Sequence, residues 1–213
     1  MLNGQRLAQV KERRMHEFFK PWIGINYENT NPKVLVLGES VPIEEAKSDW
    51  LIHHINGIID GEFNDGFQTR IQDIISIPDD YIENGNDYVL EKKIFYDRIV
   101  FQEYIQEPLS RTRQRPSREQ WDNGKEYFKQ LITKYKPDIV LCAGKELYNN
   151  LPSDGNEYKK RIKTKSGEMN IWVYDYAKKN TYVCCIAHPS SFGFKKNLWI
   201  ELYAKFNSSL GDE

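Results

Sequence analysis

The chain has 213 residues, with 30 basic and 31 acidic side chains that give a formal net charge of −1. This length suits one domain, spanning residues 1–213, with a sizeable core. No apolar stretch approaches the ~18 residues of a transmembrane helix, and the charged N-terminus lacks the apolar core of a signal peptide. Three cysteines in apolar runs favour core thiols over disulfides or a zinc site. We therefore expect a cytoplasmic protein without membrane, metal or cofactor.

Hydrophobic periodicity predicts helices that alternate with short apolar strands. The first half of the chain is predicted to form a helix at 6–19 packed on the core, a strand at 34–37, helices at 44–59 and 67–75, and a polar loop at 78–87. A strand at 99–105 follows, then a helix after Ser117 that ends at Lys136, a strand at 138–142 and a helix at 145–151. The last predicted elements are an edge hairpin within 158–176, a strand at 183–187 and a helix at 197–206. This alternation predicts a three-layer α/β/α sandwich around a mostly parallel, four-stranded sheet.

Two of these strands end in residues that can carry chemistry. Gly38-Glu39-Ser40 follows the first strand, and His188-Pro189-Ser190-Ser191 follows the last one. Because ligands bind at the carboxyl edge of open α/β sheets, we expect both segments to lie near one site. The Glu39 carboxylate could orient water, and the His188 imidazole could stabilise a departing anion. An acid at a helix start and an ordinary turn with a satisfied histidine are the alternative interpretations.

Basic and aromatic side chains cluster in loops around these segments. The basic ones are Arg111, Arg113, Arg115 and Arg118 in one loop, and Lys195 and Lys196 after the histidine turn. Such asymmetry permits a phosphate-binding face on a nearly neutral protein, although solvated loops would have the same composition. Phe67, Phe192 and Phe194 could stack on a base, and core packing is their commoner use.

Two other motifs do not support a cofactor or metal site. Gly144-Lys145 follows the third strand, but the glycine-rich phosphate-loop pattern around it is absent. His53 and His54 are adjacent, so they point to different helix faces and do not form a metal pair. We interpret both histidines as surface or cap residues.

The order of these pieces resembles the uracil-DNA glycosylase superfamily, in particular its uncharacterised bacterial glycosylase-like branches, over roughly residues 33–194. The matching stretches are residues 34–40, 96–106, 115–121, 136–145 and 187–191. The second of them carries Glu103 where related sequences tend to place an asparagine, and a carboxylate there would repel a DNA phosphate. The cysteines of the iron–sulfur branch have no counterparts in this chain.

The resemblance implies that the chain excises a damaged or modified base after flipping it out of DNA. Glu39 would then handle the water, His188 would stabilise the expelled base, and Phe67 would stack on it. The remaining expected contacts are Ser40, Gly144, Pro189, Ser190 and Ser191 on the substrate and Arg111, Arg113, Arg115, Phe192, Lys195 and Lys196 on nucleic acid. A non-catalytic module that binds nucleic acid or a nucleotide-like ligand, and a hydrolase of small nucleoside-like molecules, are the alternatives.

Overall fold

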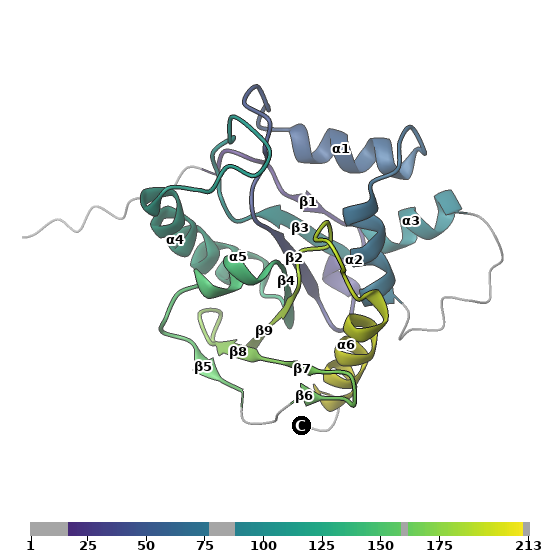
Figure 1. The fold of residues 1–213 in the computed structure, drawn as a ribbon, viewed down its shortest axis with the longest axis vertical. Coiled ribbons are helices and arrows are strands. Elements are labelled where there is room, and N and C mark those ends of the chain that lie inside the picture. Colours follow the sequence, from purple (N-terminus) through teal and green to yellow (C-terminus); the bar gives the residue numbers. More distant parts are fainter. Residues whose placement is uncertain (1–16, 77–87, 159–161, 211–213) are drawn as a thin grey trace, which may run out of the picture.

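Four parallel strands form the centre of a seven-stranded sheet in the computed structural model, which describes residues 17–76, 88–158 and 162–210 (Figure 1). In spatial order the parallel strands are β3 (Ile99–Glu103), β2 (Val34–Gly38), β4 (Ile139–Ala143) and β9 (Thr181–Ile186). Antiparallel strands extend the sheet on both sides, with β1 (Trp22–Ile23) beyond β3 and with β8 (Ile171–Tyr174) and β5 (Asn156–Glu157) beyond β9.

The central strands are buried on both faces, which explains their sequences. Every residue of β2, β3 and β4 is buried. The register places Leu35 opposite both Val100 and Val140. A parallel strand that is covered on both faces requires a nearly continuous apolar run instead of an alternating one. The runs of aliphatic residues in the sequence are therefore the signature of these strands.

Helices cover both faces of the sheet (Figure 1). One face carries α1 (Trp50–Ile59), α2 (Gly66–Ser76), α3 (Tyr88–Tyr96) and α6 (Lys196–Leu210), and the other carries α4 (Arg118–Tyr135) and α5 (Lys145–Asn149). On the first face, Val36 lies in one core with Ile71 and Phe206. On the second face, Leu37 lies in another core with Phe128. The expected helices on both faces of a mostly parallel sheet are confirmed.

The predicted four-stranded sheet is wrong, because the sheet has seven strands. Both β1 and β5 are only two residues long and at least partly exposed, so neither has an apolar run that the sequence could display. The segment 158–176 also differs from a single edge hairpin. Its strands β6 (Ile162–Lys163) and β7 (Glu168–Met169) form a separate two-stranded sheet, while β8 joins the main sheet.

Two predicted helices need correction or lie partly outside the described residues, and one helix was missed. The helix expected at 44–59 begins only at Trp50. The residues before it form turns that are tied to distant parts of the chain, because Val41 and Ala46 pack with Phe19 and the Ser48 carbonyl accepts the Lys20 N–H at 2.7 Å. The helix α3 was not predicted. Of the helix expected at 6–19, residues 6–16 lie outside the described residues and residues 17–19 are not helical. The loop expected at 78–87 also lies outside them.

The start of α4 confirms a local prediction. Ser117 Oγ accepts the Gln120 N–H at 3.2 Å, and Gln120 Oε1 accepts the Ser117 N–H at 2.8 Å, which is a complete capping box. The helix ends at Lys136 in the left-handed conformation, with φ of 46°. Within residues 17–76, 88–158 and 162–210, no helix is long and apolar enough to cross a membrane.

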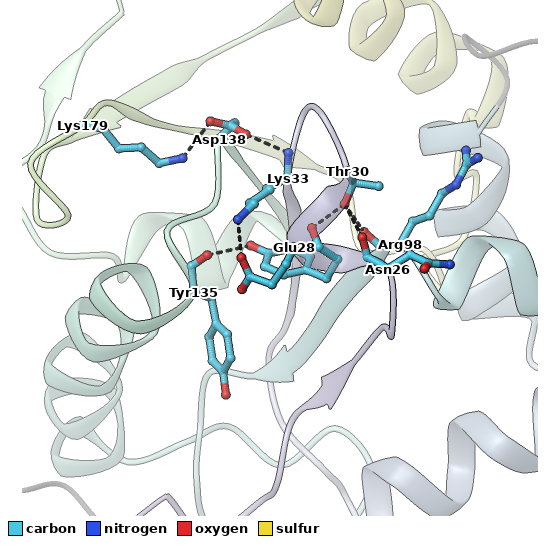
Figure 2. A network of polar contacts seen from close by, with 9 residues as sticks. Asn26, Glu28, Thr30, Lys33, Arg98, Tyr135, Asp138 and Lys179 are labelled. Atoms are coloured by element: carbon cyan, nitrogen blue, oxygen red, sulfur yellow. Dashed lines mark hydrogen bonds and ion pairs between the residues drawn. The ribbon is translucent and has the colours of Figure 1, made fainter.

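The amino-terminal edge of the parallel strands is held by a network of polar contacts (Figure 2). Asp138, before β4, accepts the Lys33 N–H at 2.8 Å and the Lys179 ammonium at 2.8 Å. The 3-10 helix η1 (Tyr27–Asn29) lies beside them, and Tyr27 donates its hydroxyl to the Tyr135 carbonyl at 3.1 Å. These contacts fix the starts of β2 and β4 relative to each other.

Candidate functional site

The carboxyl ends of β2, β4 and β9 lie at one edge of the sheet. Leu37 pairs with Cys142, and Ala143 pairs with Ile186. Glu39, Gly144 and His188 therefore leave the sheet from neighbouring strand ends. Two strand spacings, about 10 Å, separate the backbones of β2 and β9. Between them, a Cβ added at Gly144 would meet the His188 ring at an ordinary van der Waals distance of 3.8 Å, so Gly144 lies directly beside His188.

The histidine turn holds His188 against an aromatic ring from another element. The centroids of the His188 and Phe67 rings are 5.3 Å apart, at an interplanar angle of 52°. His188 Nδ1 accepts the Ser190 N–H at 3.2 Å, and the His188 carbonyl accepts the Ser191 N–H at 2.8 Å. An accepting Nδ1 leaves the proton of the neutral ring on Nε2. Packing against its neighbours partly desolvates the ring and lowers the pKa of His188 below its ordinary value of 6.5, which favours that neutral form, although the residue as a whole is exposed.

One face of α2 fixes the loop that carries His188. The Arg70 guanidinium donates to the Pro189 carbonyl, and its Cζ lies 5.4 Å from the centre of the Phe194 ring. Three residues further along, Asp73 forms an ion pair with Lys196 at 2.7 Å. Phe67, Arg70 and Asp73 are spaced by three residues, so they share a helix face. All three contact the segment 188–196, which α2 therefore holds in place.

Glu39 lies close enough to α5 to be affected by the charge of Glu146 in that helix. Its carbonyl accepts the Ile105 N–H at 3.0 Å, so its backbone is fixed against the chain that follows β3. Burial, followed by the charge of Glu146, raises the pKa of Glu39 above its ordinary value of 4.5, while Arg115 opposes that rise. Arg115 and Glu146 form a weak ion pair with 3.8 Å between Nη1 and Oε1. Of the predicted arginine cluster, Arg115 is therefore the member whose charge acts on Glu39.

The most unusual group at this edge is Glu103, which the sequence prediction did not include among the catalytic or binding residues. It ends β3 opposite Gly38, and a Cβ added at Gly38 would lie 2.3 Å from Glu103 Oε2. The glycine thus makes space for the carboxyl group. Glu103 Oε2 is buried without a hydrogen-bond partner. The other such side-chain oxygens among the described residues are the hydroxyls of Tyr135 and Tyr148.

Burial raises the pKa of Glu103 to about 8, with further contributions from the charges of Glu39 and Asp65. Glu103 is therefore mostly a neutral carboxylic acid at pH 7. The sequence prediction was that a carboxylate at this position would repel a DNA phosphate. A buried neutral acid does not exert that repulsion.

Sequence reasoning also missed a pair of side chains, His54 and Asp65, at the start of α2. His54 Nε2 is 2.9 Å from Asp65 Oδ2, and its ring stacks on Trp50 at 4.6 Å between centroids. Asp65 Oδ1 accepts the Phe67 N–H at 2.8 Å. Although burial acts to raise the pKa of Asp65, the hydrogen bonds from His54 and Phe67 outweigh it and lower that pKa. His54 is half-buried, so its interpretation as a surface or cap residue is wrong, whereas the adjacent His53 is exposed as expected.

The other predicted site residues fall into two groups. Gly144, Pro189, Ser190 and Ser191 lie around His188 through the contacts above, and Ser40 is a half-buried neighbour of Glu39. Arg111, Arg113 and Phe192 are exposed on their loops. Lys195 and Lys196 line a depression with Ser166 of the β6–β7 turn, and Lys196 pairs with Asp73 of α2. The structure thus brings together the predicted catalytic and substrate residues more closely than the predicted nucleic-acid contacts.

The part of the chain that the structure describes contains no group of three histidine, cysteine, aspartate or glutamate side chains that could hold a metal ion. Cys142, Cys184 and Cys185 are buried free thiols in the core, as predicted. In comparisons with known proteins, no family model matches the chain, and no curated protein is significantly similar to it.

Proposed function

We propose that this chain is a uracil-DNA-glycosylase-like enzyme that hydrolyses the N-glycosidic bond of a damaged or modified base in DNA. The observation that carries the proposal is the contact between the Phe67 and His188 rings, 5.3 Å apart, at the sheet edge to which Glu39 also belongs. A flipped base that stacks on Phe67 would lie beside the His188 imidazole. An aromatic platform, a hydrogen-bond donor and a carboxylate are the three groups that such a hydrolysis needs.

The reaction uses Glu39 and His188 on opposite sides of the bond. Glu39 accepts a proton from water, and the water oxygen attacks the sugar carbon C1′. The bond between C1′ and the base nitrogen breaks, and its electron pair stays on the base. His188 Nε2–H then donates a hydrogen bond to the departing base. A preorganised donor of this kind is worth about 3 to 4 kcal/mol of barrier.

Several groups could hold the DNA backbone beside this site. The Ser190 and Ser191 hydroxyls lie in the turn that α2 fixes through Arg70 and Pro189. Arg115 adds a positive charge near Glu39. These contacts suit one flipped nucleotide, and the exposed lysines Lys195 and Lys196 would extend them along the strand.

The test is release of free base from single- and double-stranded oligonucleotides that each carry one lesion. We expect Glu39→Gln and His188→Ala each to reduce the rate of release by about 10²- to 10³-fold. Glu157→Gln on the exposed strand β5 and His53→Ala on the exposed side of α1 are matched controls that should keep wild-type rates. Folding of each variant is checked by its far-ultraviolet circular dichroism.

Each negative outcome has a definite meaning. If folded wild-type protein releases no base from any lesion, the proposed activity is wrong. Salt-dependent DNA binding without release would then indicate the binding module, and release from free nucleosides without DNA affinity would indicate the small-molecule hydrolase.

A further inference from the structure

The mechanism above leaves one buried acid at the site unused. Glu103 extends from the end of β3 over Gly38, on the sheet face that α1 and α2 cover. Its Oε2 has no hydrogen-bond partner among the residues that the structure describes. An unsatisfied buried polar atom destabilises the folded state, so its presence beside a candidate active site calls for a functional explanation.

Burial first, and then the charged groups around it, keep a proton on Glu103. Glu39 follows the end of β2, and Asp65 precedes α2. The negative charges of both disfavour ionisation of Glu103. His54 of α1 pairs with Asp65 and not with Glu103. The buried Lys92 of α3 has its Nζ 3.5 Å from Asn64 Oδ1, next to Asp65. Glu39 and Glu103 are thus two acids at one strand edge with different proton affinities, the pattern that separates a base from an acid.

We propose that Glu103 is the general acid that protonates the departing base, and that the substrate is accordingly a purine-type base with a ring-nitrogen lone pair. This inference rests on the proposed function. A pyrimidine such as uracil can leave as an anion that a neutral histidine stabilises. A purine leaves more readily when a ring nitrogen accepts a proton, and Glu103 lies on the same sheet face as Phe67, on which that base would stack.

The step balances in protons and electrons. The Glu103 O–H bond breaks and its proton binds to a ring nitrogen of the base, while the C1′–N bond breaks and leaves its electron pair on the base. Glu39 takes the proton of the attacking water, whose oxygen forms the new bond to C1′. After the neutral base departs, Glu103 is ionised and Glu39 is protonated. The proton then returns to Glu103, which binds it more tightly.

The experiment measures single-turnover release of hypoxanthine and of uracil from otherwise identical oligonucleotides, between pH 5 and 10. Glu103→Gln keeps the size of the side chain and a hydrogen-bond donor but cannot transfer a proton. We expect it to slow hypoxanthine release by about 10²-fold or more and uracil release far less. Wild-type hypoxanthine release should fall as the pH rises through about 8, and this basic limb should vanish in Glu103→Gln. Glu157→Gln is the matched control.

The outcomes separate the two proposals. If Glu103→Gln releases hypoxanthine at the wild-type rate with the same basic limb, or if wild-type protein prefers uracil, the general-acid assignment is wrong while the glycosylase proposal stands. If wild-type protein releases neither base nor any other lesion, both are wrong. Should the variant fail to fold, the wild-type pH profile and base preference decide the question alone.

Discussion

The acidic groups at the two edges of the parallel sheet differ in their hydrogen bonding and burial. At the amino-terminal edge, Asp138 accepts two hydrogen bonds at 2.8 Å, from the Lys33 amide and the Lys179 ammonium (Figure 2). At the carboxyl edge, Glu103 is more deeply buried and its Oε2 has no partner, while Glu39 has a raised pKa. Asp138 is thus satisfied by two donors, whereas Glu39 and Glu103 both have a raised affinity for protons.

This difference separates a structural role from a functional one. A carboxylate that is paired with an amide and an ammonium stabilises the fold and has little capacity left for chemistry. A buried acid without a partner costs stability, and proteins retain such groups mainly where a site uses them. Asp138 therefore belongs to the scaffold, and Glu103 belongs to the candidate site.

The largest effect that tests this contrast is the pH dependence of stability after Glu103→Gln. The pKa of Glu103 rises from its ordinary 4.5 to about 8 on folding, so between these values the folded state holds a proton that the unfolded state has lost. The free energy of unfolding contributed by this group therefore falls as pH rises from about 4.5 to 8, by at most ~1.4 kcal/mol per pH unit. Relative to wild type, the glutamine variant should gain stability over that window.

Urea unfolding of both proteins at half-unit pH intervals measures this difference. Below pH 4.5 the two stability curves should run in parallel, because Glu103 is then protonated in both states. A constant offset between the variant and wild type from pH 4 to pH 9 would show that Glu103 titrates normally, and the contrast between the edges would be lost.

A smaller effect is expected at the opposite edge from Asp138→Ala. The substitution removes the acceptor for the Lys33 amide and one ion pair, and we expect the free energy of unfolding to fall by about 1 to 2 kcal/mol. Rates of base release per folded molecule should not change. Urea unfolding checks the first value, with Asp175→Ala at an exposed turn as the control. Loss of activity in a stable Asp138→Ala protein would contradict the assignment of this edge to the scaffold.

The sequence predicted the parts of this fold that depend on local patterns. The four apolar runs became the four parallel strands, and the Ser117–Gln120 spacing became a capping box. The strands β1 and β5 could not be predicted, because two residues carry no period and pair only where an edge is available. The late start of α1 depends on contacts between Val41 and distant residues.

The candidate site, too, was predicted where it follows from local patterns and missed where it depends on distant contacts. The rule that parallel strand ends meet at one edge predicted that Glu39, Gly144 and His188 would lie together. The neutral state of Glu103 depends on burial and on the charges of Glu39 and Asp65, which are distant in sequence, so only a weak local signal existed: an acid shortly after the apolar run Ile-Val-Phe. The His54–Asp65 pair likewise joins two helices across a turn, and no spacing rule indicates it.

The smallest expected effect concerns how firmly α2 holds the carboxyl edge. Arg70→Ala removes the donor to the Pro189 carbonyl and the cation above Phe194. Because Arg70 is only half-buried, we expect a loss of about 1 kcal/mol or less in the free energy of unfolding.

The Ser190 and Ser191 amides of the Arg70→Ala variant should nevertheless exchange with solvent several-fold faster, since their hydrogen bonds to His188 depend on the geometry of this turn. Hydrogen exchange measured by NMR checks this, with Lys125→Ala, which breaks an exposed ion pair to Asp122 on α4, as the control. Equal exchange rates in Arg70→Ala and wild type would mean that the turn keeps its geometry around His188 without the contacts from α2. The proposed role of α2 in fixing the carboxyl edge would then be wrong.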